Sequence, residues 1–174
     1  MDKDSARKRG LSARRSVSRE VRDAYDASLF RKMTGYAETA KMTGCYVSMG
    51  EEADTRRFLA WCFRHDKPVA VPLIQGNTLT FHRISSFDDL HPGTFGVEEP
   101  AARNEVPLSE IDLMFVPLSA FDGQKNRTGY GKGYYDAVLQ PSMKKVGIAY
   151  PEQQVDRIET DPWDIPLDEI LLPR

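Results

Sequence analysis

One stretch of eleven residues, NRTGYGKGYYD at positions 126–136, constrains the fold of this chain most strongly. Its three glycines alternate with tyrosine and lysine. An apolar run precedes the stretch at residues 112–118, and a segment with helical apolar spacing follows it, carrying Tyr135, Val138 and Leu139. The pattern predicts a strand that enters a glycine loop and leaves as a helix.

Such a glycine loop is suited to hold an anion. A strand, loop and helix in this order direct several backbone N–H groups and the positive end of the helix at one point. Arg127 and Lys132 add positive charge there, and Asp136 can hold Mg²⁺ against the same anion. We therefore interpret the loop as a cradle for a polyphosphate.

A purely structural role fits the same residues. The glycines could make only a tight turn, with Asp136 offsetting the helix dipole and Tyr134 in the core. Known nucleotide signatures do not decide the matter. A Walker loop needs Ser or Thr after its Gly-Lys, whereas Gly133 follows Lys132. The dinucleotide fingerprint needs two residues before its last glycine, and this loop has one.

Strands and helices alternate along the rest of the chain and predict an α/β fold. A strand at residues 45–48, a helix capped by Asp54 or Thr55, and a strand at residues 69–73 make a βαβ unit. Further strands are expected at residues 78–84, 112–118, 144–150 and 168–172, and a basic helix at residues 3–15. We expect one domain over residues 1–174, a three-layer sandwich with a mostly parallel twisted sheet and helices on both faces.

Two further segments have opposite character. Ser18 is predicted to cap a helix whose Val21, Tyr25, Leu29 and Met33 recur every four residues as a stripe facing the core. Residues 88–107, which are rich in Pro and Gly, lack periodicity and predict a long surface loop. Such loops are uncommon in compact domains unless they cover a site.

Charge is balanced overall but uneven along the chain. The net charge is −2 and the pI is about 5.9, so no global positive field favours nucleic acid. Residues 1–32 carry ten Lys or Arg against five Asp or Glu, whereas residues 151–174 carry seven acidic residues against two Arg. The charged N-terminus and the lack of a long apolar run predict a cytoplasmic protein without signal peptide or membrane span.

The glycine loop, together with Val-Pro at 116–117 and Ala-Phe-Asp-Gly at 120–123, resembles the signature of 5-formyltetrahydrofolate cyclo-ligases, also called methenyltetrahydrofolate synthetases. The resemblance includes a Pro-Gly-x-Phe-Gly-x-x-Glu-Pro run at 92–100. It implies ATP- and Mg²⁺-dependent cyclisation of 5-formyltetrahydrofolate to 5,10-methenyltetrahydrofolate, with release of ADP and phosphate. The expected partners are these two substrates, with no nucleic acid and no membrane, and we expect a monomer.

The resemblance also implies which residues bind ATP. Lys3 and Arg7 match the ends of the family's Lys-x-x-Leu-Arg pattern, which contacts ATP, and Lys132 and Arg127 are the expected catalytic residues. The full set implied for ATP is Lys3, Arg7, Arg127, Thr128, Gly129, Tyr130, Gly131, Lys132, Gly133, Tyr134 and Tyr135. Because the two chain ends have opposite charge and both match the family, we expect them to meet at one site.

Folate and metal positions follow from the same resemblance. A Ser-Met-x-x-Glu-x-x-Thr pattern places Glu52 at the family's folate-contacting glutamate, and one carboxylate can accept adjacent N–H donors of a reduced pterin. The set implied for the folate is Val47, Met49, Glu52, Tyr130, Gly131, Lys132, Gly133 and Tyr134. Asp136 and Asp164 are the expected ligands of Mg²⁺.

Two positions depart from the family pattern. Ala6 stands where leucine is usual, which is expected to weaken the anchoring of the first helix. Leu118 stands where glycine is usual after Val-Pro, and its bulk is expected to change either the affinity or the shape of the pocket.

Two other classes of function compete with the ligase. A small-molecule kinase would keep the glycine loop and the metal-binding acids but release a phosphorylated product. A nucleic-acid-binding module would use the basic helix at residues 3–15, and its binding would depend steeply on salt.

Overall fold

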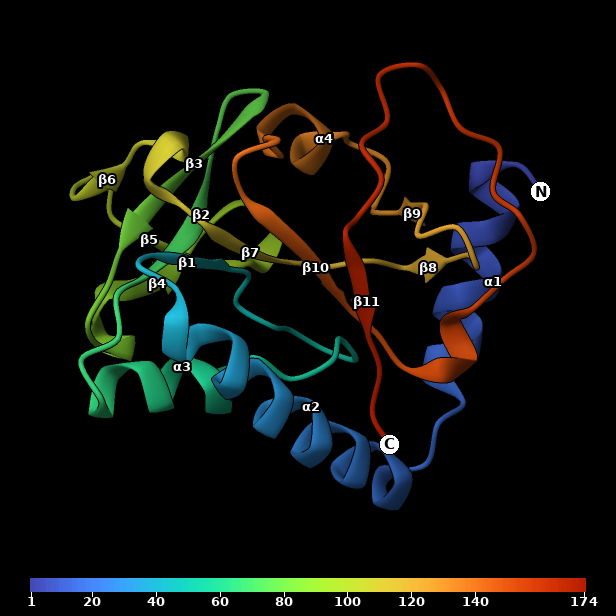
Figure 1. The fold of residues 1–174 in the computed structure, drawn as a ribbon, viewed down its shortest axis with the longest axis horizontal. Coiled ribbons are helices and arrows are strands. Elements are labelled where there is room, and N and C mark those ends of the chain that lie inside the picture. The colour runs from blue at the N-terminus through green and yellow to red at the C-terminus, as the bar shows by residue number, and fades with distance from the viewer.

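A seven-stranded sheet forms the centre of the computed structural model, which describes all 174 residues (Figure 1). Its order is β11-β10-β7-β1-β2-β3-β6. The strands are β1 (Thr43–Cys45), β2 (Val69–Gln75), β3 (Thr78–Arg83), β6 (Glu105–Val106), β7 (Leu113–Val116), β10 (Lys144–Ile148) and β11 (Glu169–Leu171). The first five strands in the order are parallel, and β3 is antiparallel to both β2 and β6.

Both faces of the central strands are buried, because successive side chains point to opposite sides. In β7, Leu113 and Phe115 belong to one hydrophobic core, and Met114 and Val116 to the other. The helices α2 (Arg19–Thr39) and α3 (Arg56–Arg64) cover the first face, and the short α4 (Tyr134–Val138) lies over the second (Figure 1). The predicted α/β class, with a mostly parallel sheet and helices on both faces, is confirmed.

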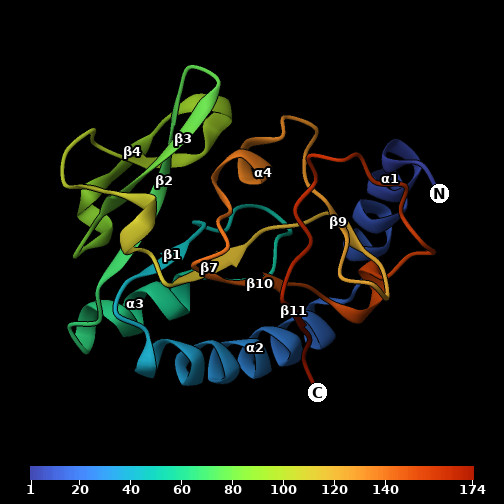
Figure 2. The same ribbon diagram turned by 45° about the horizontal axis from the view of Figure 1, so that its top comes forward.

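The first helix, α1 (Lys3–Arg15), stands apart from α2 and α3 (Figure 2). It packs on a two-stranded hairpin of β8 (Ala120–Phe121) and β9 (Arg127–Thr128). A Cβ added to Gly10 would lie 2.0 Å from the Ser119 carbonyl oxygen, so only glycine permits this close approach. Ala6 is fully buried in the same contact. The small residues therefore let the helix lie directly on the hairpin backbone.

Predictions for the first βαβ unit and for the helix before it are confirmed in part. The first strand is β1, Thr43–Cys45, which begins two residues before the predicted start and ends three residues before the predicted end. Ser18 caps α2 as expected, accepting from the Val21 amide at 3.3 Å. Leu29 and Met33 are fully buried, but Val21 is 40% exposed, because the helix begins beyond the edge of the core.

Residues 88–107 are not the predicted structureless loop. They contain a small hairpin of β4 (Leu90–Pro92) and β5 (Glu98–Pro100), followed by the edge strand β6. Prolines end both strands of this hairpin, which is where a missing N–H is tolerated.

No helix in the structure is long and apolar enough to cross a membrane.

Candidate active site

A cleft of about 950 Å³ lies beyond the carboxyl ends of the central parallel strands. Ligands bind at this edge in open α/β sheets. All residues for which the sequence implied a role in binding ATP, folate or metal line this one cleft. They come from α1, from the 46–55 loop after β1, from the glycine loop and from residues near the C-terminus. Their shared location is a finding, whereas their individual roles stay predictions.

The glycine loop is built differently from the prediction. The strand that enters it is β9, because the β8–β9 hairpin intervenes after β7. Gly131 has φ 94° and Gly133 has φ 69°, backbone conformations that side chains disfavour. The helix that leaves the loop, α4, has five residues, so its dipole is small. Attraction for an anion therefore rests on the loop's cations rather than on the helix.

Arg127 is held rigidly at the base of this loop. Its side chain is 5% exposed, and its Nη2 donates to Asp136 Oδ1 at 3.3 Å. The Nε of Arg127 is buried and has no hydrogen-bond partner. Burial lowers the pKa of this guanidinium, and the nearby carboxylate of Asp136 opposes the shift. A buried donor without a partner costs about 1–3 kcal/mol, so Arg127 is placed at a cost in stability.

The two ends of the chain meet at the cleft, as the sequence predicted. Lys3 Nζ lies 2.6 Å from an oxygen of Asp161 and 2.6 Å from an oxygen of Asp164. Burial alone would lower the pKa of Lys3, but the bonds to both carboxylates raise it. One turn further along α1, Arg7 Nε donates to the Gly129 carbonyl at 3.0 Å. The first helix therefore contributes cations to the same end of the cleft as the glycine loop.

Asp136 and Asp164 lie close to each other at this end. Asp136 Oδ1 accepts from the backbone N–H of Ile165 at 3.2 Å, next to Asp164 in the chain. No group of three or more His, Cys, Asp or Glu side chains could hold a metal alone. Mg²⁺, however, is usually bound by one or two carboxylates together with substrate phosphates. The two acids therefore fit Mg²⁺ that arrives with a polyphosphate.

Glu52 is fixed at the opposite end of the cleft. Its Oε1 accepts from the Met49 amide at 3.1 Å and its Oε2 from the Tyr130 hydroxyl at 3.0 Å. Burial raises the pKa of Glu52, while both hydrogen bonds and the charge of Arg14 oppose the rise. Val47 lines the cleft beside it. A carboxylate can accept about four hydrogen bonds, so Glu52 keeps capacity for a ligand's N–H groups.

An apolar wall, which the sequence did not identify as part of the site, joins the two ends. Ile74 and Leu79 line it from β2 and β3, Phe95 from the β4–β5 hairpin, and Trp163 from the C-terminal segment. Phe95 and Trp163 are 68% and 69% exposed, which is unusual for large aromatic side chains. The cleft therefore suits a ligand with an anionic part and a flat aromatic part.

The two departures from the family pattern have structural explanations. Leu118 does not line the cleft; its side chain is 2% exposed and packs over Gly147 of β10. Its side chain therefore does not shape the cleft directly, because Gly147 on the neighbouring strand makes room for the leucine. Ala6 is likewise buried in a close helix contact, and so it forms part of the anchoring of α1.

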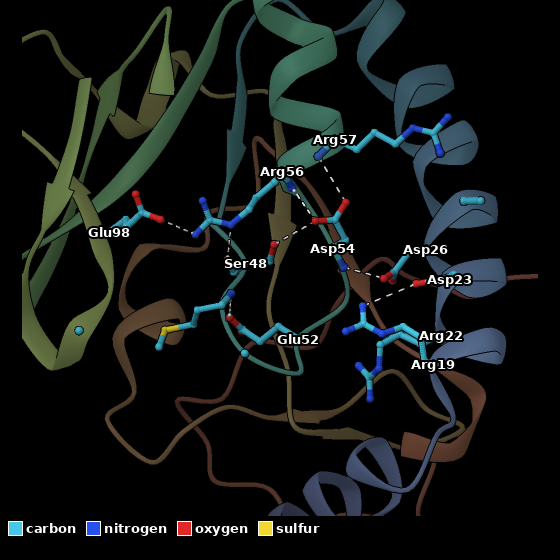
Figure 3. A pocket seen from close by; sticks show the side chains of 14 residues that line it. Arg19, Arg22, Asp23, Asp26, Ser48, Glu52, Asp54, Arg56, Arg57 and Glu98 are labelled. Carbon is cyan, nitrogen blue, oxygen red and sulfur yellow. Dashed lines mark hydrogen bonds and ion pairs between the residues drawn. The ribbon is translucent and has the colours of Figure 1, made fainter. Parts of the chain in front are cut away.

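A second pocket, of about 680 Å³, lies on the other side of the 46–55 loop (Figure 3). Several of its charged groups are engaged with each other or with the backbone, and Glu52 lines both this pocket and the cleft. Arg56 Nη2 pairs with Glu98 at 2.6 Å, and Arg22 donates to two backbone carbonyl oxygens at 2.7 Å each. Asp54 caps α3 by accepting from its first two amides.

The fold and the cleft together define the class: an α/β protein whose parallel sheet presents a cationic glycine loop and an apolar wall to one ligand site. Comparison with known sequences gives the family. The sequence model of the 5-formyltetrahydrofolate cyclo-ligase family matches residues 1–173. The chain belongs to this family of enzymes.

Individual relatives agree with the match. The 5-formyltetrahydrofolate cyclo-ligase of Haemophilus influenzae is 37% identical over 142 residues, which are 76% of each protein. The solved structure of the Aquifex aeolicus 5,10-methenyltetrahydrofolate synthetase superposes with a TM-score of 0.85 at 31% identity, covering 99% of this chain and 92% of that one. The Mycoplasma pneumoniae synthetase gives 0.80 at 25% identity over 99% of both chains.

Proposed function

We propose that the protein catalyses the ATP- and Mg²⁺-dependent cyclisation of 5-formyltetrahydrofolate to 5,10-methenyltetrahydrofolate, releasing ADP and phosphate. Family membership supports the reaction. The observation that carries the proposal is the single cleft that joins a cationic glycine loop, two acids, an apolar wall and a fixed carboxylate.

The chemistry explains why ATP is required. Cyclisation joins the formyl carbon to a second folate nitrogen, and the formyl oxygen must leave, although it is a poor leaving group at neutral pH. Transfer of the terminal phosphoryl group of ATP to that oxygen allows it to depart as phosphate, while the nitrogen's lone pair forms the new bond and the proton on that nitrogen is released. The protein must position two substrates and neutralise charge, and it needs no nucleophile of its own.

Cations of the cleft supply that neutralisation. Lys3, Arg7, Arg127 and Lys132 would contact the phosphates, together with amides of the glycine loop. In the structure Lys3 and Arg127 pair with acids of the same cleft, and a polyphosphate would compete for them. Mg²⁺ held by Asp136 and Asp164 would supply charge neutralisation at the phosphate oxygens.

Glu52 and the apolar wall suit the folate. The carboxylate can accept adjacent N–H groups of the reduced pterin, and the aromatic side chains offer flat faces to its rings. Tyr130 and Lys132 line the cleft from the glycine loop, and the Tyr130 hydroxyl reaches Glu52, so both residues would face both substrates.

An absorbance assay of methenyl formation tests the proposal. The chromophore should appear only when 5-formyltetrahydrofolate, ATP and Mg²⁺ are all present, and complete chelation should abolish it. Full activity after chelation would exclude the metal. A phosphorylated product without the chromophore would indicate a kinase. No structural observation favours a nucleic-acid module, since Lys3 and Arg7 of the basic helix line the cleft.

A further inference from the structure

Arg14 is a buried cation that neither the sequence pattern nor the proposed chemistry assigns. It lies in the last turn of α1 and is 6% exposed, although it lines the cleft. Its Nη1 is 3.2 Å from the Tyr130 hydroxyl and 3.4 Å from the Leu118 carbonyl oxygen, while its Nε is buried without a partner. Burying a guanidinium with an unsatisfied N–H lowers stability, so a core role alone does not explain it.

Tyr130 connects this arginine to Glu52. Arg14 donates to the hydroxyl oxygen of Tyr130, and that hydroxyl donates to Glu52 Oε2 at 3.0 Å. Three segments distant in sequence are thus joined: the end of α1, the glycine loop and the 46–55 loop. A donor chain that ends on a carboxylate favours the ionised form of that carboxylate.

We propose that Arg14 is a positioning residue that holds Glu52, through the Tyr130 hydroxyl, as an ionised carboxylate facing the folate end of the cleft. Its relevance to folate binding rests on the proposed function. The ionisation state of the Glu52 carboxylate in the free protein does not depend on the proposed function.

Among the groups around Glu52, Arg14 is the cation that acts on its carboxylate. Burial and the charge of Glu52 raise the pKa of the phenols of Tyr46, Tyr130 and Tyr135, so these neighbours are neutral near pH 7 and supply no charge. Burial raises the pKa of Glu52, and Arg14 is the charged group that opposes the rise. Arg22 and Arg56, on the other side of the loop, donate to backbone carbonyl oxygens of that loop instead.

The chain contains a matched control for this pair. Arg15 follows Arg14, Glu51 precedes Glu52, and Arg15 Nε lies 3.4 Å from Glu51. The Arg15 side chain is 66% exposed, so solvent screens the pair. Replacing Arg15 removes the same charge from the same helical turn without touching the Tyr130 link.

The direct test is an NMR titration of the Glu52 carboxyl carbon in the free protein, with the resonance assigned by its loss in Glu52→Gln. Arg14→Gln should move the midpoint to higher pH, Tyr130→Phe should move it in the same direction, and Arg14→Lys should restore it in part. Arg15→Gln should leave it in place. Tyr130→Phe removes one hydroxyl only, so it keeps the test valid if Arg14→Gln unfolds.

A kinetic measurement adds the functional consequence. For Arg14→Gln, the acid limb of kcat/KM for 5-formyltetrahydrofolate should move to higher pH, with about a three- to tenfold loss near pH 6 and near recovery at pH 8. KM for ATP should change little. An unmoved midpoint in both Arg14→Gln and Tyr130→Phe would overturn the proposal. If the midpoint moves but the protein has no cyclo-ligase activity, the positioning role of Arg14 stands and the proposed function is rejected.

Discussion

The cleft and the pocket of Figure 3 lie on opposite sides of the 46–55 loop, and both are lined by arginine and acidic residues. They differ in how those charges are used. In the pocket, Arg22 and Arg56 donate to carbonyl oxygens or pair with a carboxylate. In the cleft, Lys3 and Arg127 also pair with acids, but Arg14 and Lys132 pair with no carboxylate, and the Nε of Arg14 and that of Arg127 are unsatisfied.

This difference shows that a charged pocket is not by itself a binding site. Compensated charges stabilise the arrangement of a loop, and a ligand would have to break their bonds. Uncompensated charges cost stability in the free protein and become favourable when an anion binds.

Removing a cation of the glycine loop should have the largest effect. Lys132→Ala and Arg127→Ala should each lower kcat/KM by roughly 30- to 1000-fold, because each removes a charge-assisted contact that strengthens in the transition state. Steady-state kinetics beside thermal melts measures this. Arg56→Ala, in the compensated pocket, is the control and should stay within about threefold of wild type. If Arg56→Ala lowered kcat/KM as much as the two cleft variants, the cleft and the pocket of Figure 3 would not differ in how their charges are used.

Lys3 should affect ATP specifically. Lys3→Gln should raise KM for ATP by about tenfold with little change for the folate, because it removes one cation from the phosphate end alone. Lys8→Gln, on the exposed face of the same helix, is the matched control. Removal of residues 1–8 would be a poorer test than this substitution, because it also deletes the fully buried Ala6. Equal rises for both substrates would reject the assignment.

The smallest effect should come from Asp26 in the Figure 3 pocket. Burial raises the pKa of Asp26, although Tyr150 and the Asp54 amide donate to it. A raised folded pKa means that the carboxylate favours the folded state less as pH rises through that pKa. Asp26→Asn should therefore leave kinetics unchanged and raise the melting temperature at pH 7 by up to about 3 °C.

The pH dependence of that gain provides its check. Below the unfolded pKa of about 3.9, Asp26 is protonated in both states, so the difference between wild type and variant should vanish. A loss of stability at pH 7 with reduced activity would instead give Asp26 a role in the site.

The sequence predicts those structural features that depend on local residue patterns. The strands β2 and β7 and the cap at Ser18 follow from periodicity and cap chemistry, and the family pattern names residues that do share one cleft. The β4–β5 hairpin was missed because each of its strands has only three residues and its prolines resemble a loop. Leu118 lies two residues after Val116 and so belongs to the same buried face, which strand alternation could have indicated.

Arg14 was missed for a different reason. It lies seven residues after Arg7, on the same face of α1, but no family position marks it, and basic residues on a terminal helix usually face solvent. Only the close contact at Gly10 turns this face inward. Phe95 and Trp163 carry no spacing signal, because their place in the cleft depends on how distant segments pack.

The pairing of Lys3 with Asp161, 158 residues away in sequence, also orders the events of biosynthesis. Domains acquire structure as they are synthesised, N-terminal parts first, but a contact of this span must wait for almost the whole chain. The proposed folate end of the cleft is formed by the 46–55 loop and the glycine loop, which leave the ribosome earlier. The proposed nucleotide end would therefore be completed last, and a nascent or C-terminally shortened chain would lack it.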